Sequence, residues 1–359
     1  MKRIVKSLLC IFLFLVIFNS DVIYAAQVHR VAPGESLFVI AQKYGVTVSE
    51  IVAKNNLRNP ERIFPRQVLI IPGKQQQSLN NMYVVKPGDS LFLISQKLGV
   101  TMEALANANS ITNWDLLYVG QVLKIPKLEP KVQQSPSESY MNSIAYLAKE
   151  FRGDFYLSGP TNTNRVALTF DDGPDGKYTP QVLDVLKQYK VPATFFLIGE
   201  RSARYSWVVD RIFKEGHLIG NHSWSHPNLA KVSRERLEQE ISNTERILHE
   251  ITGKNTALIR PPYGAVSRES LEYMKKVNYK IINWNVDSVD WRDRDVDQIL
   301  INTLPDVKPG AILLFHSAGG EGQSMAATVQ ALPEIIYTLR VQGYEFVALD
   351  DLIGIPAYK

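Results

Sequence analysis

The chain contains two copies of one segment, and the copies start 54 residues apart. Residues 31–72 align with residues 85–126 without a gap, and 19 of the 42 aligned pairs are identical. Self-similarity of this kind identifies a repeated folding unit. At about 150 residues per domain, a chain of 359 residues has room for two domains or three small ones. We therefore expect two small modules beside one larger domain.

Each copy predicts a strand, two helices and a returning strand. The first strand runs into a Pro-Gly turn, and a serine then caps a helix whose apolar residues recur at helical spacing. A glycine ends that helix, a threonine caps the second helix, and proline closes the last strand. The matching elements are strands 27–31 and 83–85, Ser36 and Ser90, Gly45 and Gly99, Thr47 and Thr101, and strands 67–71 and 121–125.

The two copies resemble the LysM domain. The resemblance rests on the Pro-Gly-acid-Ser-Leu turn, the Gly-Val-Thr between the helices, the asparagines at 55 and 109, and the Gln-x-Leu-x-Ile-Pro end. It implies binding of N-acetylglucosamine-containing glycans, such as peptidoglycan or chitin, between the first turn and the loop before the last strand. The implied grooves are 34–37 with 59–63 and 88–91 with 113–117, and the candidate contact residues are Gly34, Ser36, Leu37, Asn59, Gly88, Ser90, Leu91 and Asn113.

Capping and turn formation alone could also explain Gly34, Ser36, Gly88 and Ser90. Two weak sites on one chain would gain avidity for a polymer, which favours the binding interpretation. The first copy departs from the second at Pro65-Arg66, where the second has Val119-Gly120. Arg66 lacks the access of glycine to positive φ, so we expect the shape of the first groove to differ.

The N-terminus predicts a secretory signal peptide, residues 1–26. Lys2, Arg3 and Lys6 precede an unbroken apolar run at 8–18, and Ala25 and Ala26 are the candidate cleavage site. The alternative is a retained signal anchor, but a membrane span needs about 20 apolar residues, and this run would have to cross Asp21. We expect a secreted, cell-wall-associated protein with no membrane span after cleavage.

Charge and cysteine content exclude several classes of function. The only cysteine, Cys10, lies in the predicted signal peptide, so the mature chain has no thiol for a disulfide, a nucleophile or a zinc ligand. The net charge is +4, and removal of Lys2, Arg3, Lys6 and Asp21 leaves +2. That charge is too small for a nucleic-acid-binding surface. We expect a monomer.

The larger domain is predicted at 151–359, after linkers at 74–81 and 128–150 that separate modules 27–73 and 82–127. Seven candidate strands alternate with amphipathic helices, which favours a parallel (β/α)7 barrel. The strands are 166–170, 193–198, 217–220, 258–260, 281–286, 311–315 and 345–349, and helical patterns include 179–189, 233–251 and 328–342. Barrel enzymes carry their chemistry at the carboxyl ends of the strands.

Polar residues follow several of these strands. Asp171 and Asp172 end the first strand, and their side chains should diverge toward different partners. His222 and His226 follow the third strand and would meet on one face if that loop turned helically. Two imidazoles and one carboxylate form an open three-ligand set that suits zinc. His316 also ends a strand, and this clustering argues against isolated surface histidines.

Five stretches together resemble the polysaccharide deacetylase family, also called the NodB homology domain. They are Thr-Phe-Asp-Asp-Gly-Pro from 169, Asn-His-Ser-Trp-Ser-His from 221, Arg-Pro-Pro-Tyr-Gly from 260, Asp-Ser-Val-Asp-Trp from 287 and Leu-Leu-Phe-His-Ser from 313. The resemblance spans about Arg165 to Leu352. It implies a distorted (β/α)7 barrel and metal-dependent hydrolysis of acetyl groups on sugars.

The resemblance also implies residue roles. Asp172, His222 and His226 hold a divalent ion, most often zinc, with cobalt or manganese as alternatives. Asp171 is the general base that activates water, and His316 is the general acid that protonates the leaving amine. Arg260 orients Asp171, while Asp290 orients His316, with Asp287 as the alternative for that second role. The Tyr263 N–H binds the oxyanion, and Trp291 and Leu314 line the acetyl pocket.

Together the modules and the barrel predict an N-deacetylase that acts on the N-acetylglucosamine of peptidoglycan while the modules hold the glycan. A chitin-oligosaccharide deacetylase or an O-acetyl-xylan esterase would share the barrel motifs, although the modules argue against xylan. A non-enzymatic wall-binding scaffold with an inactive barrel should have lost at least one of five groups, and all five are present: Asp171, Asp172, His222, His226 and His316.

Overall fold

The protein is described from a computed structural model. The described residues are 26–60, 62–73, 82–85, 89–98, 100, 102–111, 117, 121–126, 143–320 and 322–359. The predicted signal peptide up to residue 25, linker 74–81, most of linker 128–150, Gly88 and Asn113 lie outside them. Among the described residues, none of the helices combines the length and apolar character needed to cross a membrane.

Module 1, residues 27–73, has the predicted order of elements. It consists of β1 (Gln27–Arg30), α1 (Leu37–Tyr44), α2 (Val48–Lys54) and β2 (Val68–Ile71), with β1 antiparallel to β2. The Ser36 hydroxyl accepts a hydrogen bond from the Val39 N–H at the start of α1. Gly45 ends α1 in the left-handed conformation, and Thr47 forms a capping box with Glu50. The capping residues therefore act as the sequence predicts.

Module 2, residues 82–126, repeats this arrangement. Its elements are β3 (Met82–Val84), α3 (Leu91–Leu98), α4 (Met102–Ala108) and β4 (Val122–Lys124). Asn55 ties α2 to β2 through the Ile51 and Ile70 carbonyls, and Asn109 ties α4 to β4 in the same way. Each asparagine also accepts a hydrogen bond from the strand backbone. The repeated asparagine is thus a structural tie between the second helix and the last strand.

Arg66 corrects one expectation. It adopts φ 70°, in the left-handed region that favours glycine, which is the residue at the equivalent position of the second copy. The Arg66 N–H donates to the Val31 carbonyl at 2.7 Å, which holds the turn in place. Its guanidinium lies 5.9 Å from the ring centre of Tyr337 in the larger domain. A contact outside the module therefore accompanies a backbone conformation that arginine rarely takes.

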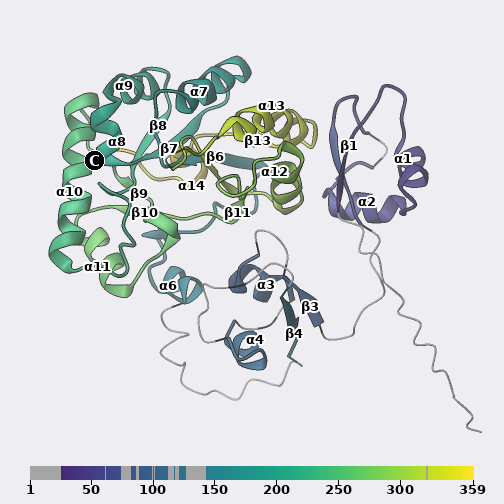
Figure 1. Ribbon diagram of the computed structural model, residues 1–359, viewed down its shortest axis with the longest axis horizontal. Helices are drawn as coiled ribbons and strands as arrows, with labels where there is room; N and C mark the ends of the chain where they lie inside the picture. The colour runs from purple at the N-terminus through teal and green to yellow at the C-terminus, as the bar shows by residue number, and fades with distance from the viewer. Residues whose placement is uncertain are drawn as a thin grey trace, which may run out of the picture.

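The larger domain is a curled sheet of parallel strands surrounded by helices (Figure 1). The hydrogen-bonded order is β11-β12-β6-β7-β8-β9-β10-β5, and β13 also pairs with β6. Since β11 and β5 end this path, the barrel is open between them. The strands are β5 (Phe155–Tyr156), β6 (Arg165–Asp171), β7 (Ala193–Leu197), β8 (Leu218–Asn221), β9 (Leu258–Ile259), β10 (Lys280–Ile282), β11 (Val286–Asp287), β12 (Ile312–His316) and β13 (Glu345–Phe346).

Helices pack against this sheet through apolar faces. Val182, Leu183 and Leu186 of α7, for example, recur at helical spacing and are buried against the strands. The helices are α6 (Ile144–Glu150), α7 (Tyr178–Tyr189), α8 (Gly199–Arg204), α9 (Ser206–Lys214), α10 (Arg234–Thr252), α11 (Arg268–Lys276), α12 (Val296–Thr303), α13 (Ala326–Val341) and α14 (Leu349–Ile353).

Three segments differ from the sequence-based elements. The expected strand 281–286 is split into β10 and β11, which lie on different parts of the sheet. The expected strand 345–349 is only β13, because α14 begins at Leu349. In the predicted linker 128–150, α6 forms, and its Leu147 is buried with Phe151 and Phe155 of the barrel. Strand β5 was missed because two residues carry no alternation pattern.

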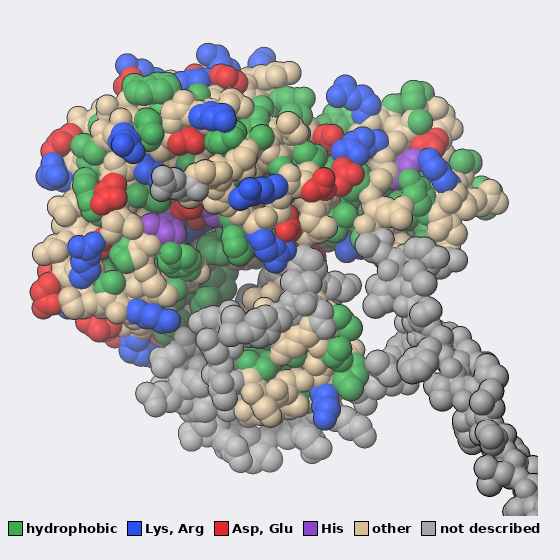
Figure 2. All heavy atoms as spheres, in the orientation of Figure 1, with side chains coloured by type: hydrophobic (Ala, Val, Ile, Leu, Met, Phe, Trp, Pro, Cys, Tyr) green, Lys and Arg blue, Asp and Glu red, His purple; other side chains and the backbone are tan. Residues whose placement is uncertain are grey.

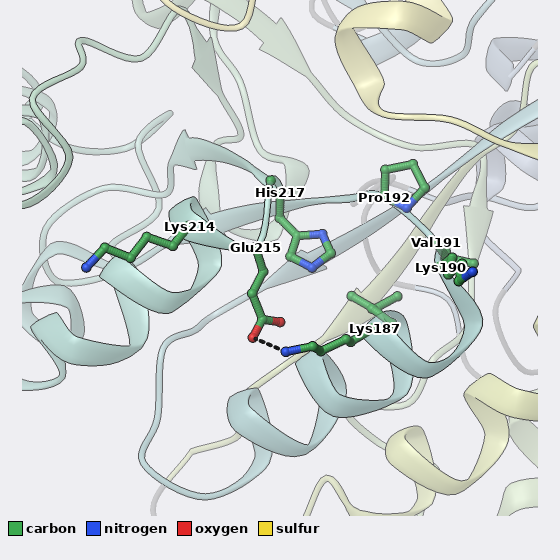
Figure 3. Close-up of a pocket in the computed structure, with 9 residues that line it drawn as sticks. Lys187, Lys190, Val191, Pro192, Lys214, Glu215 and His217 are labelled. Atoms are coloured by element: carbon green, nitrogen blue, oxygen red, sulfur yellow. Dashed lines mark ion pairs between the residues drawn. The ribbon is translucent and has the colours of Figure 1, made fainter.

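A cavity of about 450 Å³ lies at the amino ends of β7 and β8, away from the predicted site residues (Figure 3). It is lined by the ends of α7 and α9, where Lys187 and Glu215 form an ion pair at 3.7 Å. His217 lies beside it, and its Nδ1 accepts a hydrogen bond from the Ala193 N–H. Burial lowers the pKa of His217 to about 4. The folded protein therefore keeps this imidazole neutral.

We expect His217 to make the protein less stable in mild acid. Unfolded histidine has a pKa near 6.5, so protons favour the unfolded chain below that pH. The stabilisation is present above pH 6.5 and is lost as the pH falls toward 4, and it amounts to about 3 kcal/mol. Chemical unfolding at pH 7 and pH 4.5 should show a smaller loss for His217→Gln than for the wild type. The exposed His249 of α10 provides the control His249→Gln, which should match the wild type.

Candidate active site

The predicted site residues converge at the carboxyl ends of adjacent strands. Asp171 ends β6 and His316 ends β12, and these two residues are direct partners in the register of the parallel pair. His222 follows β8, and Arg260 follows β9. Figure 2 shows histidine and acidic side chains gathered in a hollow of the larger domain. Parallel strand order thus brings together residues up to about 145 positions apart in the sequence.

Asp172, His222 and His226 form a cluster with metal-ligand geometry. One ligand atom from each residue lies within 4.8 Å of the others. The Nε2 atoms of His222 and His226 are 3.4 and 3.1 Å from Oδ1 of Asp172. That oxygen is buried and has no hydrogen-bond partner among the described residues. A buried carboxylate oxygen left unpaired beside two imidazole nitrogens is the arrangement that a divalent cation would complete.

Neighbouring groups fix the tautomer of His222 and the charge of Asp172 in the states that can bind a cation. The His222 Nδ1–H donates to the Arg260 carbonyl at 2.6 Å, which leaves the Nε2 lone pair directed toward Asp172. Burial by itself would raise the pKa of Asp172, but the neighbouring imidazoles of His222 and His226 hold this pKa well below its usual range. Asp172 is therefore an anion at neutral pH. The donor set of two imidazoles and a carboxylate fits zinc.

Asp171 lies beside this cluster and has its own partner. The fully buried Arg260 donates from Nη1 to Oδ1 of Asp171 at 2.7 Å and to the Thr169 hydroxyl at 2.8 Å. The second oxygen, Oδ2, lies 3.8 Å from Nε2 of His222 and so faces the cluster. The adjacent aspartates therefore diverge, as the sequence predicts. One oxygen of Asp171 is held by Arg260, and the other is directed toward the site.

His316 is held by Asp290. Its Nδ1 lies 2.7 Å from Oδ1 of Asp290, and its backbone N–H donates to Oδ2 at 2.9 Å. Asp287 has a different role, because its carboxylate accepts a hydrogen bond from the Val289 N–H in a turn. Burial by itself would lower the pKa of His316, but Asp290, with smaller contributions from Asp172 and Asp171, raises this pKa to about 10. A bound cation would reduce the contribution of Asp172.

The loop that carries the two histidines differs from the expected helical turn. Residues 222–226 are not helical, and Ser223 and His226 have φ values of 65° and 61°. The imidazole rings still meet, with centroids 5.1 Å apart. The buried carboxylate of Glu240 holds the loop by accepting hydrogen bonds from the Trp224 and Ser225 N–H groups at 2.7 and 2.8 Å. Glu240, on the buried face of α10, thus holds the loop in a non-helical conformation in which the two imidazoles meet.

Of the expected substrate-contacting residues, Tyr263 lies beside the metal-ligand cluster. Tyr263 has φ 62°, and its exposed ring lies 4.8 Å from that of His226. Trp291 is 49% exposed, whereas Leu314 is 3% exposed within β12. A residue with positive φ that is not glycine stores strain and often marks a functional site. Asp172, Tyr263 and Val289 all show this strain in the strand-end loops.

Three supporting residues were missed in the sequence. Thr328 of α13 donates its hydroxyl to Oδ2 of Asp290 at 2.8 Å. Arg201 of α8 donates to the carbonyls of Asp172 and Gly319 at 2.7 and 2.9 Å and so joins two strand-end loops. Glu240 is the third. Glu240 and Thr328 are polar residues on otherwise apolar helix faces, and that pattern could have identified them.

In the modules, the candidate glycan contacts serve structural purposes. Leu37 and Leu91 are buried in the module cores, so their side chains do not line a groove. Gly34 has φ 83° in the first turn, and Ser36 caps α1. The Asn59 carbonyl accepts a hydrogen bond from the Arg62 N–H in the facing loop. In the described part of module 1, the exposed residues of the two loops, such as Gly34, Ser36 and Asn59, are what remains for a ligand.

Comparisons with known proteins match each part of the chain. The polysaccharide deacetylase profile matches residues 158–282, and the LysM domain profile matches 29–72 and 83–126. A peptidoglycan-N-acetylglucosamine deacetylase of Bacillus cereus is 44% identical over 198 residues, which cover 55% of this chain and 71% of that protein. The peptidoglycan-N-acetylglucosamine deacetylase PgdA of Listeria monocytogenes is 31% identical over 342 residues, covering 92% and 69%.

A solved structure supports the same relationship. The crystal structure of the Bc1960 peptidoglycan N-acetylglucosamine deacetylase, in complex with a hydroxamate-type benzamide, superimposes with a TM-score of 0.57 at 41% identity. The match covers 59% of this chain and 99% of that one. The curled parallel sheet is therefore an architecture already seen in a deacetylase.

Proposed function

Because the chain belongs to the polysaccharide deacetylase family, we propose that it hydrolyses the N-acetyl group of N-acetylglucosamine units in peptidoglycan. The observation that carries the proposal is the strand-end cluster of Asp171, Asp172, His222, His226 and His316. In it Asp172 lies beside two imidazoles, Arg260 holds Asp171, and Asp290 holds His316. The relatives act on peptidoglycan by name, and the two LysM modules favour a glycan that contains N-acetylglucosamine.

Asp172, His222 and His226 would hold the divalent cation. Such an ion supplies a Lewis acid that polarises the amide carbonyl and makes water acidic enough to react near neutral pH. We propose zinc on the basis of the two imidazoles and the carboxylate, with cobalt and manganese as alternatives that metal replacement would separate. The proposal rests on the unpaired Oδ1 of Asp172 and the tautomer that Arg260 imposes on His222.

Proton transfer is assigned to Asp171 and His316. Oδ2 of Asp171 faces the cluster and can accept a proton from the attacking water, while Arg260 holds Oδ1 and fixes the carboxylate orientation. His316, protonated on account of Asp290, can deliver a proton to the amine that leaves. The Tyr263 N–H can stabilise the negative charge on the carbonyl oxygen. Trp291, which is half exposed, and the buried Leu314 are proposed to line the pocket for the acetyl methyl group.

We expect Asp290 to set the alkaline limit of activity. Substitution Asp290→Asn removes the main charge that raises the pKa of His316, so this pKa falls and the general acid loses its proton at a lower pH. The alkaline limb of kcat/KM for acetate release should move down by about 1–2 pH units. Asp287→Asn is the matched control, because Asp287 bonds to Val289 and acts on His316 only through its charge, so its limb should move much less. Equal shifts in both variants would contradict the assignment.

The proposed place of action is the cell wall outside the cytoplasm, reached through the N-terminal signal peptide and retained by glycan binding of the modules. The test of the function is acetate release from purified peptidoglycan, with analysis of which sugar carries the new amine. Chitin oligosaccharides and acetylated xylan are the comparison substrates. Release from xylan alone, or from none of the three, would contradict the proposal.

A further inference from the structure

The sheet of module 1 packs on the deacetylase domain at α12 and α13 (Figure 1). Strand β2 is buried on both faces. Leu69 and Ile71 lie in the core of the module, while Val68 and Ile70, which point the other way, lie in the main apolar core of the larger domain. The Val68 N–H donates to the Thr338 hydroxyl of α13 at 3.1 Å. A strand that serves two cores belongs to both domains.

Charged groups surround this apolar contact. Arg30 of β1 donates to Asp297 of α12 at 2.9 Å and to Glu334 of α13 at 3.0–3.1 Å. Figure 2 shows acidic and basic side chains side by side along the boundary between the larger domain and module 1. Burial by itself would lower the pKa of Arg30, but Glu334 and Asp297 together raise this pKa above its usual value. Two acidic side chains, one on each helix, thus pair with the single arginine Arg30 of module 1.

The loops of module 1 add further contacts. The Tyr337 hydroxyl donates to the Pro65 carbonyl at 2.8 Å, and the Arg66 guanidinium lies over the same ring. Asn56 donates to the Pro305 carbonyl at 2.8 Å, and Arg58 donates to Asn164 at 2.8 Å. Arg58 also lies 5.3 Å from the ring centre of Tyr344. Both ends of the module sheet are therefore connected to the larger domain.

The second copy provides an internal comparison. Its positions equivalent to the docking residues Arg30, Asn56, Arg58, Arg66 and Ile70 are Val84, Ser110, Thr112, Gly120 and Lys124. The core positions of module 1, in contrast, are retained or replaced by similar apolar residues, except that Ser95 replaces Ala41. Val84 and Val122 of module 2 are 46% and 52% exposed, whereas Val68 is fully buried. These five differences between the repeats fall on the surface that docks module 1, although Val68 itself is retained as Val122.

We propose that module 1 is a fixed part of the deacetylase domain, docked through β1 and β2 on α12 and α13, and that module 2 cannot replace it there. The two copies then differ in purpose although they share a fold. Module 1 moves with the active site as one body, so a glycan bound to it would meet the site in one orientation. The docking itself does not rest on the proposed function.

Cross-linking tests the docked state. In a Cys10→Ser background of the full chain, the pair Arg30→Cys and Glu334→Cys, whose side chains are paired and partly exposed, should be joined within one molecule by a short bismaleimide. The matched control uses the equivalent, exposed position of module 2, with Val84→Cys and Glu334→Cys, and should be joined at least about ten-fold more slowly. Equal rates for the two pairs, or no product from the first pair, would overturn the proposal.

Activity of the joined protein tests whether the docked state works. The joined Arg30–Glu334 pair should release acetate from peptidoglycan within about two-fold of the same variant before joining. Loss of activity on joining would show that module 1 must leave α12 and α13 during turnover, and that would also overturn the proposal. Acetate release before joining reports on the proposed function alone, so its failure is distinguishable from failure of the docking.

Amide hydrogen exchange gives a second measurement that needs no cysteine. Arg30→Glu places a like charge beside Asp297 and Glu334, and should speed exchange in 67–71 and in α13 by about ten-fold. Val84→Glu makes the same change at the equivalent position of module 2 and should leave both segments unchanged. If Arg30→Glu leaves 67–71 protected, or if both variants act alike, module 1 is not docked in the way proposed.

Discussion

Replacement of Asp171 by asparagine should reduce acetate release from peptidoglycan by about a thousand-fold, within the range that general acid–base catalysis provides. An amide cannot accept the proton that Oδ2 of Asp171 is placed to receive beside His222. Asparagine is isosteric, and its carbonyl oxygen can still accept the hydrogen bond from the buried Arg260. The measurement is kcat/KM for acetate release at neutral pH.

Two controls separate chemistry from folding in this variant. The thermal unfolding temperature should fall, because Arg260 is fully buried and would lose its charge partner, but the protein should remain folded at the assay temperature. Metal content should equal that of the wild type, because the proposed cation ligands are Asp172, His222 and His226. Activity within ten-fold of the wild type would show that Asp171 is not the base.

Substitution His222→Ala should remove both the cation and the activity. The change deletes one of three ligands and leaves Asp172 and His226 without the geometry that holds an ion. Bound zinc, measured by elemental analysis after dialysis, should fall from about one equivalent to nearly none, and acetate release should fall by about 10⁴-fold or more. Treatment of the wild type with a chelator should cause the same loss of activity, and added zinc should restore the activity.

The exposed His249 on α10 is the comparison for this substitution. His249→Ala removes an imidazole of the same chain outside the cluster and should change neither zinc content nor acetate release. The His222 imidazole also donates to the Arg260 carbonyl, so the variant should be checked for unfolding. A folded His222→Ala protein that keeps its zinc and its activity would refute the proposed metal site.

The sequence predicts the site residues at the strand ends better than it predicts the residues that hold them in place. Asp171, Asp172, His222, Arg260 and His316 could be named because each follows an apolar run, and parallel strands bring their carboxyl ends to one edge. The choice of Asp290 over Asp287 came from the family resemblance, and only the geometry shows that Asp287 caps a turn. The helical turn that would have placed His222 and His226 on one face does not form, because Glu240 and positive φ values shape that loop.

What the sequence determined by itself is local or periodic. Turn residues and caps such as Ser36, Gly45 and Thr47 act on their own neighbours, and repetition exposes the two modules without any knowledge of their contacts. Short elements such as β5 and the split of 281–286 into β10 and β11 have no such pattern, because their place depends on which strand they meet.

Only the tertiary structure decided which distant groups touch. The Thr328 bond to Asp290, the Glu240 bonds to the histidine loop and the docking of Val68 on Thr338 join segments between 15 and 270 positions apart. A pattern along the chain records that a residue is polar or apolar, and burial of a polar group demands a partner, but neither names that partner. The packing of α13 supplies that choice for Asp290 and for Val68, and the packing of α10 supplies it for the histidine loop.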